Sequence, residues 1–203
     1  MSGEIKVWDW FVRGFHWSLV ASFAVAYVTG DEESRLHVWS GYAILALLAA
    51  RVVWGFAGTR HARFSDFVFP PRVIIRYAMA MLTFRAPRYL GHNPLGGAMV
   101  VTLLVCLSLT GITGYLLLPA DATIADRSAV MRIAPIATAL ANGGDERHRE
   151  RGDSVLEEVH EALAELSLML VFLHVAGVLA SSLVHRENLV RAMITGRKRA
   201  GPD

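Results

Sequence analysis

Two histidines, His160 and His174, lie fourteen residues apart in one long apolar run, VHEALAELSLMLVFLHVAGVLASSLV. Fourteen helical residues fall within about 40° of four full turns, so both imidazoles face the same way, about 21 Å apart along the axis. Imidazole is costly to bury in hydrocarbon without a partner. One such group near each end of a membrane span predicts two cofactors stacked across the bilayer.

Two further histidines match these two depths on other apolar segments. His37 begins the second segment at the level of His160, and His16 lies near the start of the first at the level of His174. Two pairs at two levels are what two six-coordinate b-type haems need, because each iron takes one axial nitrogen from either side of the ring. We therefore predict that the pairs His16/His174 and His37/His160 are the axial ligands of two haems b.

Other roles could explain one of these four histidines, but they do not explain all four together. One intramembrane histidine could form a hydrogen bond between helices, but that role does not account for four residues matched in depth. A zinc site would need its ligands to converge on one point. The one cysteine, Cys106, excludes an internal disulfide, a CxxC zinc site and a covalent CxxCH haem. We expect Cys106 to be a small core residue.

The elements that must carry these histidines are membrane-spanning helices. Of the 203 residues 54% are hydrophobic, with a mean hydropathy of +0.40, whereas a soluble domain has about 45–50% apolar residues. Backbone groups cannot remain unpaired in lipid, so apolar segments of about 20 residues are helices. The fold class predicted is an all-α membrane protein, one domain over residues 1–203 built as a four-transmembrane-helix bundle. The predicted spans are about 13–29, 36–57, 96–118 and 159–184.

Charge predicts the orientation of this bundle. The first seventeen residues carry acidic and aromatic side chains where a signal peptide has a basic region, so we expect the first span to be retained. Fourteen Lys and Arg residues flank the spans on the side of the N-terminus, the 58–95 loop and the C-terminal tail, against six on the other side. The excess predicts that both termini are cytoplasmic. Topology accounts for the basic residues, and no nucleic-acid partner is expected.

The segments between the spans give weaker predictions. In the cytoplasmic loop 58–95, PPRVIIRYAMAMLTFRAPR is too short and too charged to span, which predicts a helix lying in the interface. The outer loop 119–158 ends in a polar stretch that we expect to be mobile. In the third span, Gly111 and Gly114 either allow close helix packing or leave room for a flat macrocycle, and the two interpretations are compatible.

Haem propionates are anionic and need cationic partners. Arg13 lies nearly one turn before His16, and Arg51 lies near the cytoplasmic end of the second span, so either could meet a propionate there. Arg51 could equally reach out to the lipid headgroups. Arg35 could serve the outer haem. His92, in the cytoplasmic loop, is either an interface anchor or a residue bordering the cytoplasmic haem or a quinone site.

The motifs RGFHW, LHVWSGYAIL, RYLGHNPLGG and the HE…LHVAGVLASSLVHRENLVRAMITG end resemble the bacterial cytochrome b561 family, which includes the b-type cytochrome subunits of nickel–iron hydrogenases. The resemblance covers nearly the whole chain apart from residues 119–153. It implies a four-helix bundle of the bacterial inner membrane with two non-covalent b haems, and the family's ligands map onto His16, His37, His160 and His174. Some relatives carry a further histidine four residues after His37, where this chain has Gly41.

The predicted function is therefore a di-haem b-type cytochrome that transfers electrons across the membrane. The resemblance implies exchange between the quinone pool and a periplasmic redox partner, such as a c-type cytochrome. A stand-alone superoxide:quinone-type oxidoreductase and a hydrogenase-type membrane anchor and electron-transfer subunit are the alternatives, and a non-redox transporter is a third class. We place the quinone at the cytoplasmic side, where the amphipathic loop and its arginines crowd the bundle. Lipid is an expected partner, and a homodimer is compatible with this interpretation.

Overall fold

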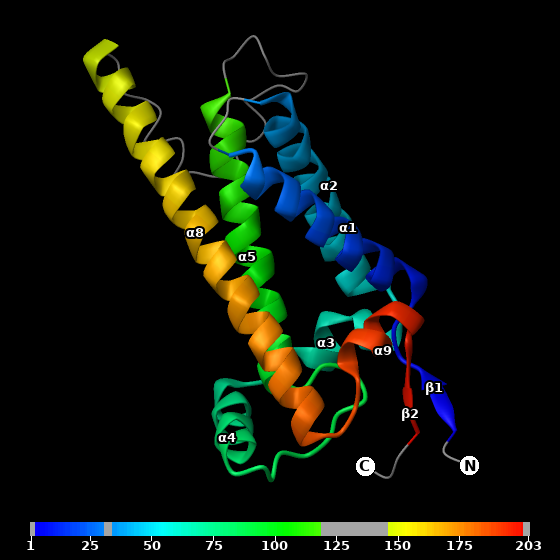
Figure 1. Ribbon diagram of the computed structural model, residues 1–203. Helices are drawn as coiled ribbons and strands as arrows, with labels where there is room; N and C mark the ends of the chain where they lie inside the picture. Colours follow the sequence, from blue (N-terminus) through cyan, green and yellow to red (C-terminus); the bar gives the residue numbers. More distant parts are fainter. Residues whose placement is uncertain (1–2, 31–33, 119–145, 201–203) are drawn as a thin grey trace.

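A computed structural model describes residues 3–30, 34–118 and 146–200, with the backbone alone for residues 146–153. Its four long helices form an upright bundle (Figure 1). Each is long and apolar enough to cross a membrane. The predicted all-α membrane bundle is confirmed. The helices are α1 (Trp10–Val28), α2 (Arg35–Ala57), α5 (Pro94–Leu117) and α8 (Glu146–Val184), the last with its apolar part over Ser154–Val184.

Side-chain caps determine where three of these helices begin. Asp9 accepts a hydrogen bond from the backbone N–H of Val12 at 2.8 Å, and Ser34 accepts one from that of His37 at 3.2 Å. Asn93 caps α5 in the same way, with Pro94 in the first helical position. Each cap satisfies a backbone donor that the first helical turn leaves free. The caps of α1 and α2 therefore determine where the helices that carry His16 and His37 begin.

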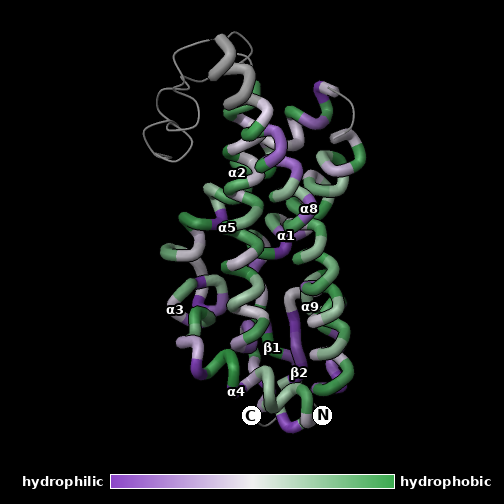
Figure 2. Tube along the Cα trace, turned by 90° about the vertical axis from the view of Figure 1, so that its left-hand side faces the viewer, coloured by the Kyte–Doolittle hydropathy of each residue, from purple (hydrophilic) through white to green (hydrophobic). Residues whose placement is uncertain are grey.

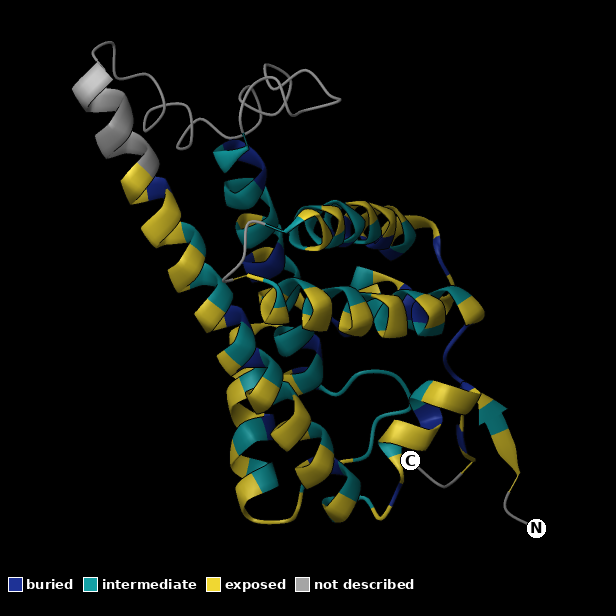
Figure 3. Ribbon diagram, turned by 45° about the horizontal axis from the view of Figure 1, so that its top comes forward, coloured by how far each residue is buried: buried dark blue, intermediate teal, exposed yellow. Residues whose placement is uncertain are grey.

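The surface of the bundle suits a lipid environment. Only 6% of the apolar window of α1 and 11% of that of α8 is buried within the chain. The exposed residues include Val28, Phe172 and Leu183. Exposed positions recur along the long helices (Figure 3), and these helices are largely hydrophobic (Figure 2). An aqueous protein rarely exposes so much contiguous apolar surface, whereas in hydrocarbon it needs no cover.

The bundle is assembled from two helix pairs. α5 packs along α8, α1 packs along α2, and α2 joins the pairs by packing against α5. The α2–α5 seam is closed by Ile44, Leu48 and Leu107. A Cβ atom on Gly111 would come within 2.7 Å of the Leu45 side chain. Gly111 therefore permits close packing of α5 on α2, one of its two predicted roles.

The observed helices differ from the predicted spans mainly in α8. This helix begins at Glu146 rather than near residue 159. Residues 146–158 were predicted as part of the outer loop, but they are helical. They extend the membrane-spanning helix toward the N-terminus by a polar segment. The remainder of that loop, residues 119–145, and residues 31–33 lie outside the described part of the chain.

Both termini and the segment between α2 and α5 lie at one end of the bundle, here called the terminal end (Figure 1). This segment contains the short helices η1 (Arg60–Ala62) and α3 (Phe64–Phe67) and the amphipathic helix α4 (Pro71–Leu82). α4 buries Tyr77 and leaves Arg72 and Arg76 exposed. The predicted amphipathic helix in the loop is therefore present.

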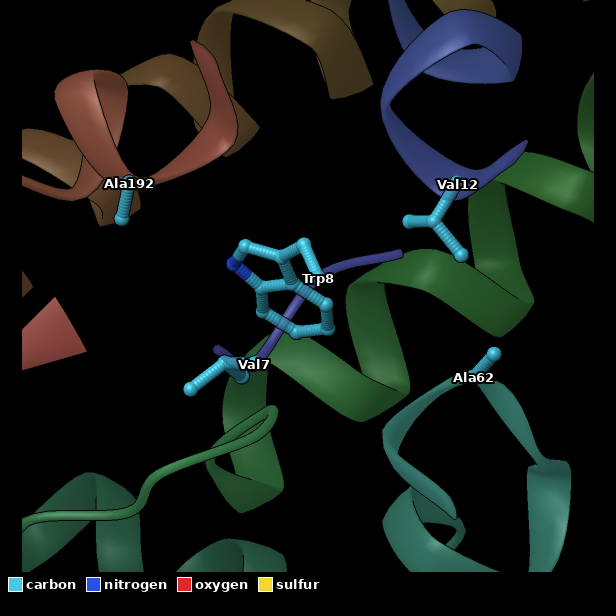
Figure 4. Close-up of a cluster of buried hydrophobic side chains, with 5 residues drawn as sticks. All are labelled: Val7, Trp8, Val12, Ala62 and Ala192. Carbon is cyan, nitrogen blue, oxygen red and sulfur yellow. The ribbon is translucent and has the colours of Figure 1, made fainter. Parts of the chain in front are cut away.

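The chain ends close this end with a feature that the sequence pattern did not predict. Strand β1 (Glu4–Lys6) pairs antiparallel with β2 (Arg197–Arg199), so that Glu4 lies opposite Arg199. Helix α9 (Leu189–Thr195) leads into β2 through Gly196, whose φ of 78° and close approach to the Trp8 carbonyl require glycine. Figure 4 shows the small core beneath, formed by Val7, Trp8, Val12, Ala62 and Ala192. We call β1, β2, α9 and residues 58–67 the terminal cap.

Candidate functional site

Helix α8 brings each of its two intramembrane histidines against a histidine of another helix. The ring centroids of His16 and His174 are 6.5 Å apart, and those of His37 and His160 are 6.1 Å apart. All four rings are partly buried. The structure therefore brings together both pairs that were predicted from depth, His16/His174 toward the terminal end and His37/His160 toward the opposite end.

These separations suit a metal held between two imidazoles. Two metal–nitrogen bonds of about 2 Å and two ring radii of about 1 Å add to about 6 Å between centroids on opposite sides of one ion. Rings in direct hydrogen-bonded contact would share a proton between their nitrogen atoms, and neither pair has such a bond. Within the described residues, no three His, Cys, Asp or Glu side chains group as a site for a bare metal ion. The donor set fits an iron whose remaining ligands come from a macrocycle.

The His37/His160 pair has defined tautomers. Nδ1 of His37 lies 2.9 Å from the carbonyl oxygen of Ala26 in α1, and Nδ1 of His160 lies 3.0 Å from that of Thr110 in α5. A carbonyl oxygen only accepts, so each Nδ1 must carry the hydrogen and donate it. Each Nε2 then keeps its lone pair for a metal. A metal-ligating histidine usually donates its other ring N–H to an oxygen acceptor in this way.

Helix α5 is shaped to receive His160. A Cβ atom on Gly114 would lie 2.8 Å from Cε1 and 3.3 Å from Nδ1 of His160. Glycine at this position therefore lets the ring reach the carbonyl of Thr110. The predicted room at Gly114 is occupied by an imidazole ring, and the threonines around it were missed by sequence reasoning. Their signal was the TGITG motif, two threonines and two glycines at three-residue spacing.

The His16/His174 pair is held differently. Nδ1 of His16 is buried with no hydrogen-bond partner in the described residues. The His16 ring packs edge-on against Trp17, with ring centroids 5.0 Å apart. Nothing in the described chain fixes the tautomer of this pair by a backbone carbonyl. The His16 ring is held by its contact with Trp17.

Glycines leave open space beside both pairs. Gly41 follows His37 by four residues and Gly177 follows His174 by three, so each lies on the helical face of its histidine. A Cβ atom at either glycine would meet no other atom within 4 Å. A flat macrocycle between the paired rings would therefore meet little side-chain bulk on these faces. The residues present fit a b-type haem at each pair.

Arg51 has the properties expected of a propionate partner, because it is a buried cation with a free hydrogen-bond donor in the described residues. Its side chain is 2% exposed, and its Nη1 atom has no hydrogen-bond partner in the described residues. The guanidinium lies 5.5 Å from the ring centroid of Phe64 and 5.7 Å from that of Phe67. The alternative in which Arg51 reaches the lipid headgroups is wrong, because α3 covers the guanidinium.

The other predicted site residues have different surroundings. Nη1 of Arg13 donates to the backbone oxygen of Ile194 at 2.6 Å, while its Nε is buried and has no partner among the residues that the structure describes. Arg13 thus ties α1 to α9 and keeps one donor free. Arg35 is the first residue of α2 and is exposed. These positions leave Arg51 as the most enclosed of the three predicted arginines.

His92 lies inside the terminal end rather than at an interface. Its ring centroid is 4.6 Å from that of Trp8 and 4.7 Å from that of Phe67. Burial, together with the positive charges of Arg51 and Lys198, lowers the pKa of His92 to about 3. The ring is therefore neutral at physiological pH. Its Nδ1 atom is buried without a hydrogen-bond partner in the described residues.

Lys198 of β2 was not predicted as a site residue, although it is 6% exposed. Its ammonium lies 5.8 Å from the Trp8 ring centroid and 3.5 Å from the carbonyl oxygen of Tyr89. Cys106, in contrast, is a buried core residue as expected, and its Sγ atom lies 3.2 Å from Oγ of Ser167.

Comparison with known proteins agrees with this geometry. Residues 7–196 match the family described as prokaryotic cytochrome b561, which covers both histidine pairs and most of the terminal cap. No curated protein and no solved structure matches the chain.

Proposed function

The chain belongs to the prokaryotic cytochrome b561 family, and from this membership we propose that it holds two b haems and passes electrons between them across the membrane. A membrane b-type cytochrome that takes part in electron transfer is what the family establishes. The number of haems, their ligands, the partners and the orientation are our proposal. In it, His16 and His174 ligate one iron, and His37 and His160 ligate the other.

One observation carries this proposal: both histidine pairs have the ring separation of a metal sandwiched between imidazoles, at 6.5 and 6.1 Å. The two pairs share α8, where fourteen residues separate their histidines by about 21 Å. That distance covers most of a hydrocarbon core about 30 Å thick. Two sites so spaced would form a path across the bilayer.

The protein's own residues then have distinct tasks. Each haem, when bound, supplies a one-electron ferric/ferrous couple. Two histidines per iron leave no open coordination position, which favours electron transfer without ligand exchange. Arg51 would hold a propionate by its unpaired guanidinium nitrogen. The apolar helices exclude water from both sites.

We further propose that the terminal end faces the cytoplasm and the opposite end the periplasm, as the excess of basic residues predicts. A quinone would bind at the terminal end, and a periplasmic redox protein would dock at the opposite end. Replacing Arg76 and His92 by alanine tests the quinone site. If both variants keep wild-type rates of quinone-coupled haem oxidation, the proposed quinone position is wrong.

The central experiment is a reduced-minus-oxidised spectrum of the purified protein with haem quantitation. We expect two low-spin b haems per chain, and one haem in His160→Ala and in His174→Ala. His61→Ala is the matched control, because this histidine pairs with Asp66 at 2.9 Å and belongs to neither pair. One haem per wild-type chain, or two haems in both variants, would refute the proposal.

A further inference from the structure

Two oxygen atoms of α5 accept the single hydrogen on Nδ1 of His160. One is the carbonyl oxygen of Thr110 at 3.0 Å, and the other is the hydroxyl oxygen of Thr113 at 3.1 Å. The Thr113 hydroxyl also lies 3.0 Å from the carbonyl oxygen of Leu109 and 2.9 Å from that of Thr110. Its hydrogen is donated to one of these carbonyls, because the Nδ1 hydrogen is already accounted for. The hydroxyl oxygen therefore accepts from His160.

A buried polar contact keeps α5 and α8 aligned for this interaction. Ser167 is fully buried and lies seven residues from both His160 and His174. Its hydroxyl is 3.3 Å from that of Thr110 and 3.2 Å from Sγ of Cys106. Groups buried between helices in hydrocarbon favour the register that pairs them. That register brings the 110–113 turn of α5 to the ring of His160.

We infer that Thr113 is a positioning residue that lowers the midpoint potential of the haem at His37/His160. This inference rests on the proposed function. Thr113 touches neither an electron donor nor an acceptor and acts through the ligand, whose Nδ1–H it accepts. The His16/His174 pair offers the internal contrast, because no hydroxyl or carbonyl of the described residues accepts from Nδ1 of His16.

The physical reason is the effect of the hydrogen bond on ligand basicity. Donation from Nδ1–H to an oxygen atom puts more electron density on the opposite nitrogen and makes the imidazole a stronger donor. A stronger donor stabilises ferric more than ferrous iron, which lowers the potential. The interaction is strengthened by its position inside the membrane, where the dielectric constant is low.

The test is potentiometric titration of the two haems in Thr113→Val, which keeps the shape of the side chain and removes the hydroxyl. We expect the ferric/ferrous equilibrium of one haem to shift about fivefold toward ferrous, which is about 40 mV at 59 mV per tenfold. The haem that shifts should be the one lost in His160→Ala, and the other should keep its potential. Haem content should remain two per chain.

Two further variants separate this role from a structural one. Thr113→Ser restores a hydroxyl and should restore the wild-type potential. Thr102→Val removes a hydroxyl of the same helix whose partner among the described residues is the Ala98 carbonyl, at 3.0 Å, and should change neither potential. An unchanged potential in Thr113→Val, or an equal shift in Thr102→Val, would overturn the inference while two bound haems would still support the proposed function. A wild-type chain without two haems would instead refute the proposed function.

Discussion

The two histidine pairs share one helix and differ in how the chain holds them. His37 and His160 each donate to a backbone carbonyl of a neighbouring helix. Nδ1 of His16 is buried and has no such acceptor in the described residues. The first pair is therefore oriented by hydrogen bonds within the bundle, and the second by the packing around it.

The two pairs also differ in which parts of the chain surround them. His160 is served by a single turn of α5, where Thr110, Thr113 and Gly114 meet its ring. The terminal end below His174 is built from distant parts of the chain, since β1 pairs with β2 across almost the whole sequence. One site is therefore encoded locally, and the environment of the other depends on tertiary assembly. Four substitutions test this distinction.

The largest effect on haem retention is expected at Gly114. In Gly114→Ala the new methyl group would lie 2.8 Å from Cε1 of His160, so the ring must leave the Thr110 carbonyl. We expect at least a tenfold loss in retention of the haem at His37/His160, measured as haem content after dilution into haem-free detergent. The haem at His16/His174 should be retained.

Gly111→Ala is the control for this substitution. Its methyl group would come equally close, 2.7 Å, to Leu45, but it would meet the end of a flexible side chain rather than a bonded ring. Loss of both haems in Gly114→Ala would show that the two sites are not independent.

These assignments show which parts of the molecule its sequence predicts. The spans and the histidine pairs were predicted because hydropathy, helical period and depth are local properties. The terminal cap was not, because strands of three residues carry almost no periodic signal and their partners lie at opposite chain ends. The burial of Arg51 was left open for a related reason, since Phe64 and Phe67 cover it from a helix of only four residues.

The largest effect on the stability of the fold is expected at Glu187, which lies between α8 and α9 and contacts β2 of the terminal cap. This carboxylate is 8% exposed and accepts from Arg88 at 2.9 Å and from the backbone N–H of Arg199 at 3.3 Å. Glu187→Gln leaves the half-buried Arg88 and the buried Lys198 without their counter-charge. Removing one partner of a buried pair costs about 3 kcal/mol, which unfolding in detergent followed by tryptophan fluorescence would measure.

The control is Glu4→Gln, in which an exposed carboxylate 3.7 Å from Arg197 is neutralised. Exposed pairs contribute about 0.5 kcal/mol or less. Equal destabilisation by the two variants would mean that the buried pair does not hold the cap. Haem content at His37/His160 should be unchanged in both.

A smaller effect is expected at Asp9, which joins α1 to the cap. Its second carboxylate oxygen accepts from Trp54 Nε1 at 3.0 Å and from Thr59 Oγ1 at 2.6 Å. Burial alone would raise the pKa of Asp9, but the hydrogen bonds from Thr59, Val12 and Trp54 together hold it below its usual value. Asp9→Asn keeps an oxygen acceptor for the helix cap but loses the acceptor of the Trp54 and Thr59 hydrogen bonds. We expect the free energy of unfolding to fall by about 1–2 kcal/mol.

The contribution of Asp9 to stability should depend on pH in a definite direction. Because the pKa of Asp9 is lower in the folded than in the unfolded chain, its stabilisation is complete above the unfolded value and is lost as the pH falls toward the folded value. Wild-type stability should therefore fall in acid more steeply than that of Asp9→Asn. Parallel pH curves for the two proteins would contradict the prediction.

The smallest effect, on potential alone, is expected at Arg51. Reduction of a haem adds negative charge, so a buried cation beside it favours the reduced form. Arg51 lies near the end of α2 that meets the terminal cap, against Phe64 and Phe67, and the His16/His174 pair lies toward that same end of the bundle. Arg51→Met keeps the side-chain volume beneath Phe64 and Phe67 and leaves the carboxylate of Asp9 without this cation. The loss of the Arg51 charge and the uncompensated charge of Asp9 both lower the potential of that haem. Together they should shift its ferric/ferrous equilibrium about tenfold toward ferric, which is about 59 mV.

The comparison between the pairs decides how this result is interpreted. Arg51→Met should lower the potential of the haem lost in His174→Ala, whereas Thr113→Val should raise the potential of the other. Arg72→Met, at an exposed position on α4, should move neither. If Arg51→Met shifted both potentials equally, its charge would act over the whole bundle, and the separation between a site set by hydrogen bonds and a site set by charge would fail.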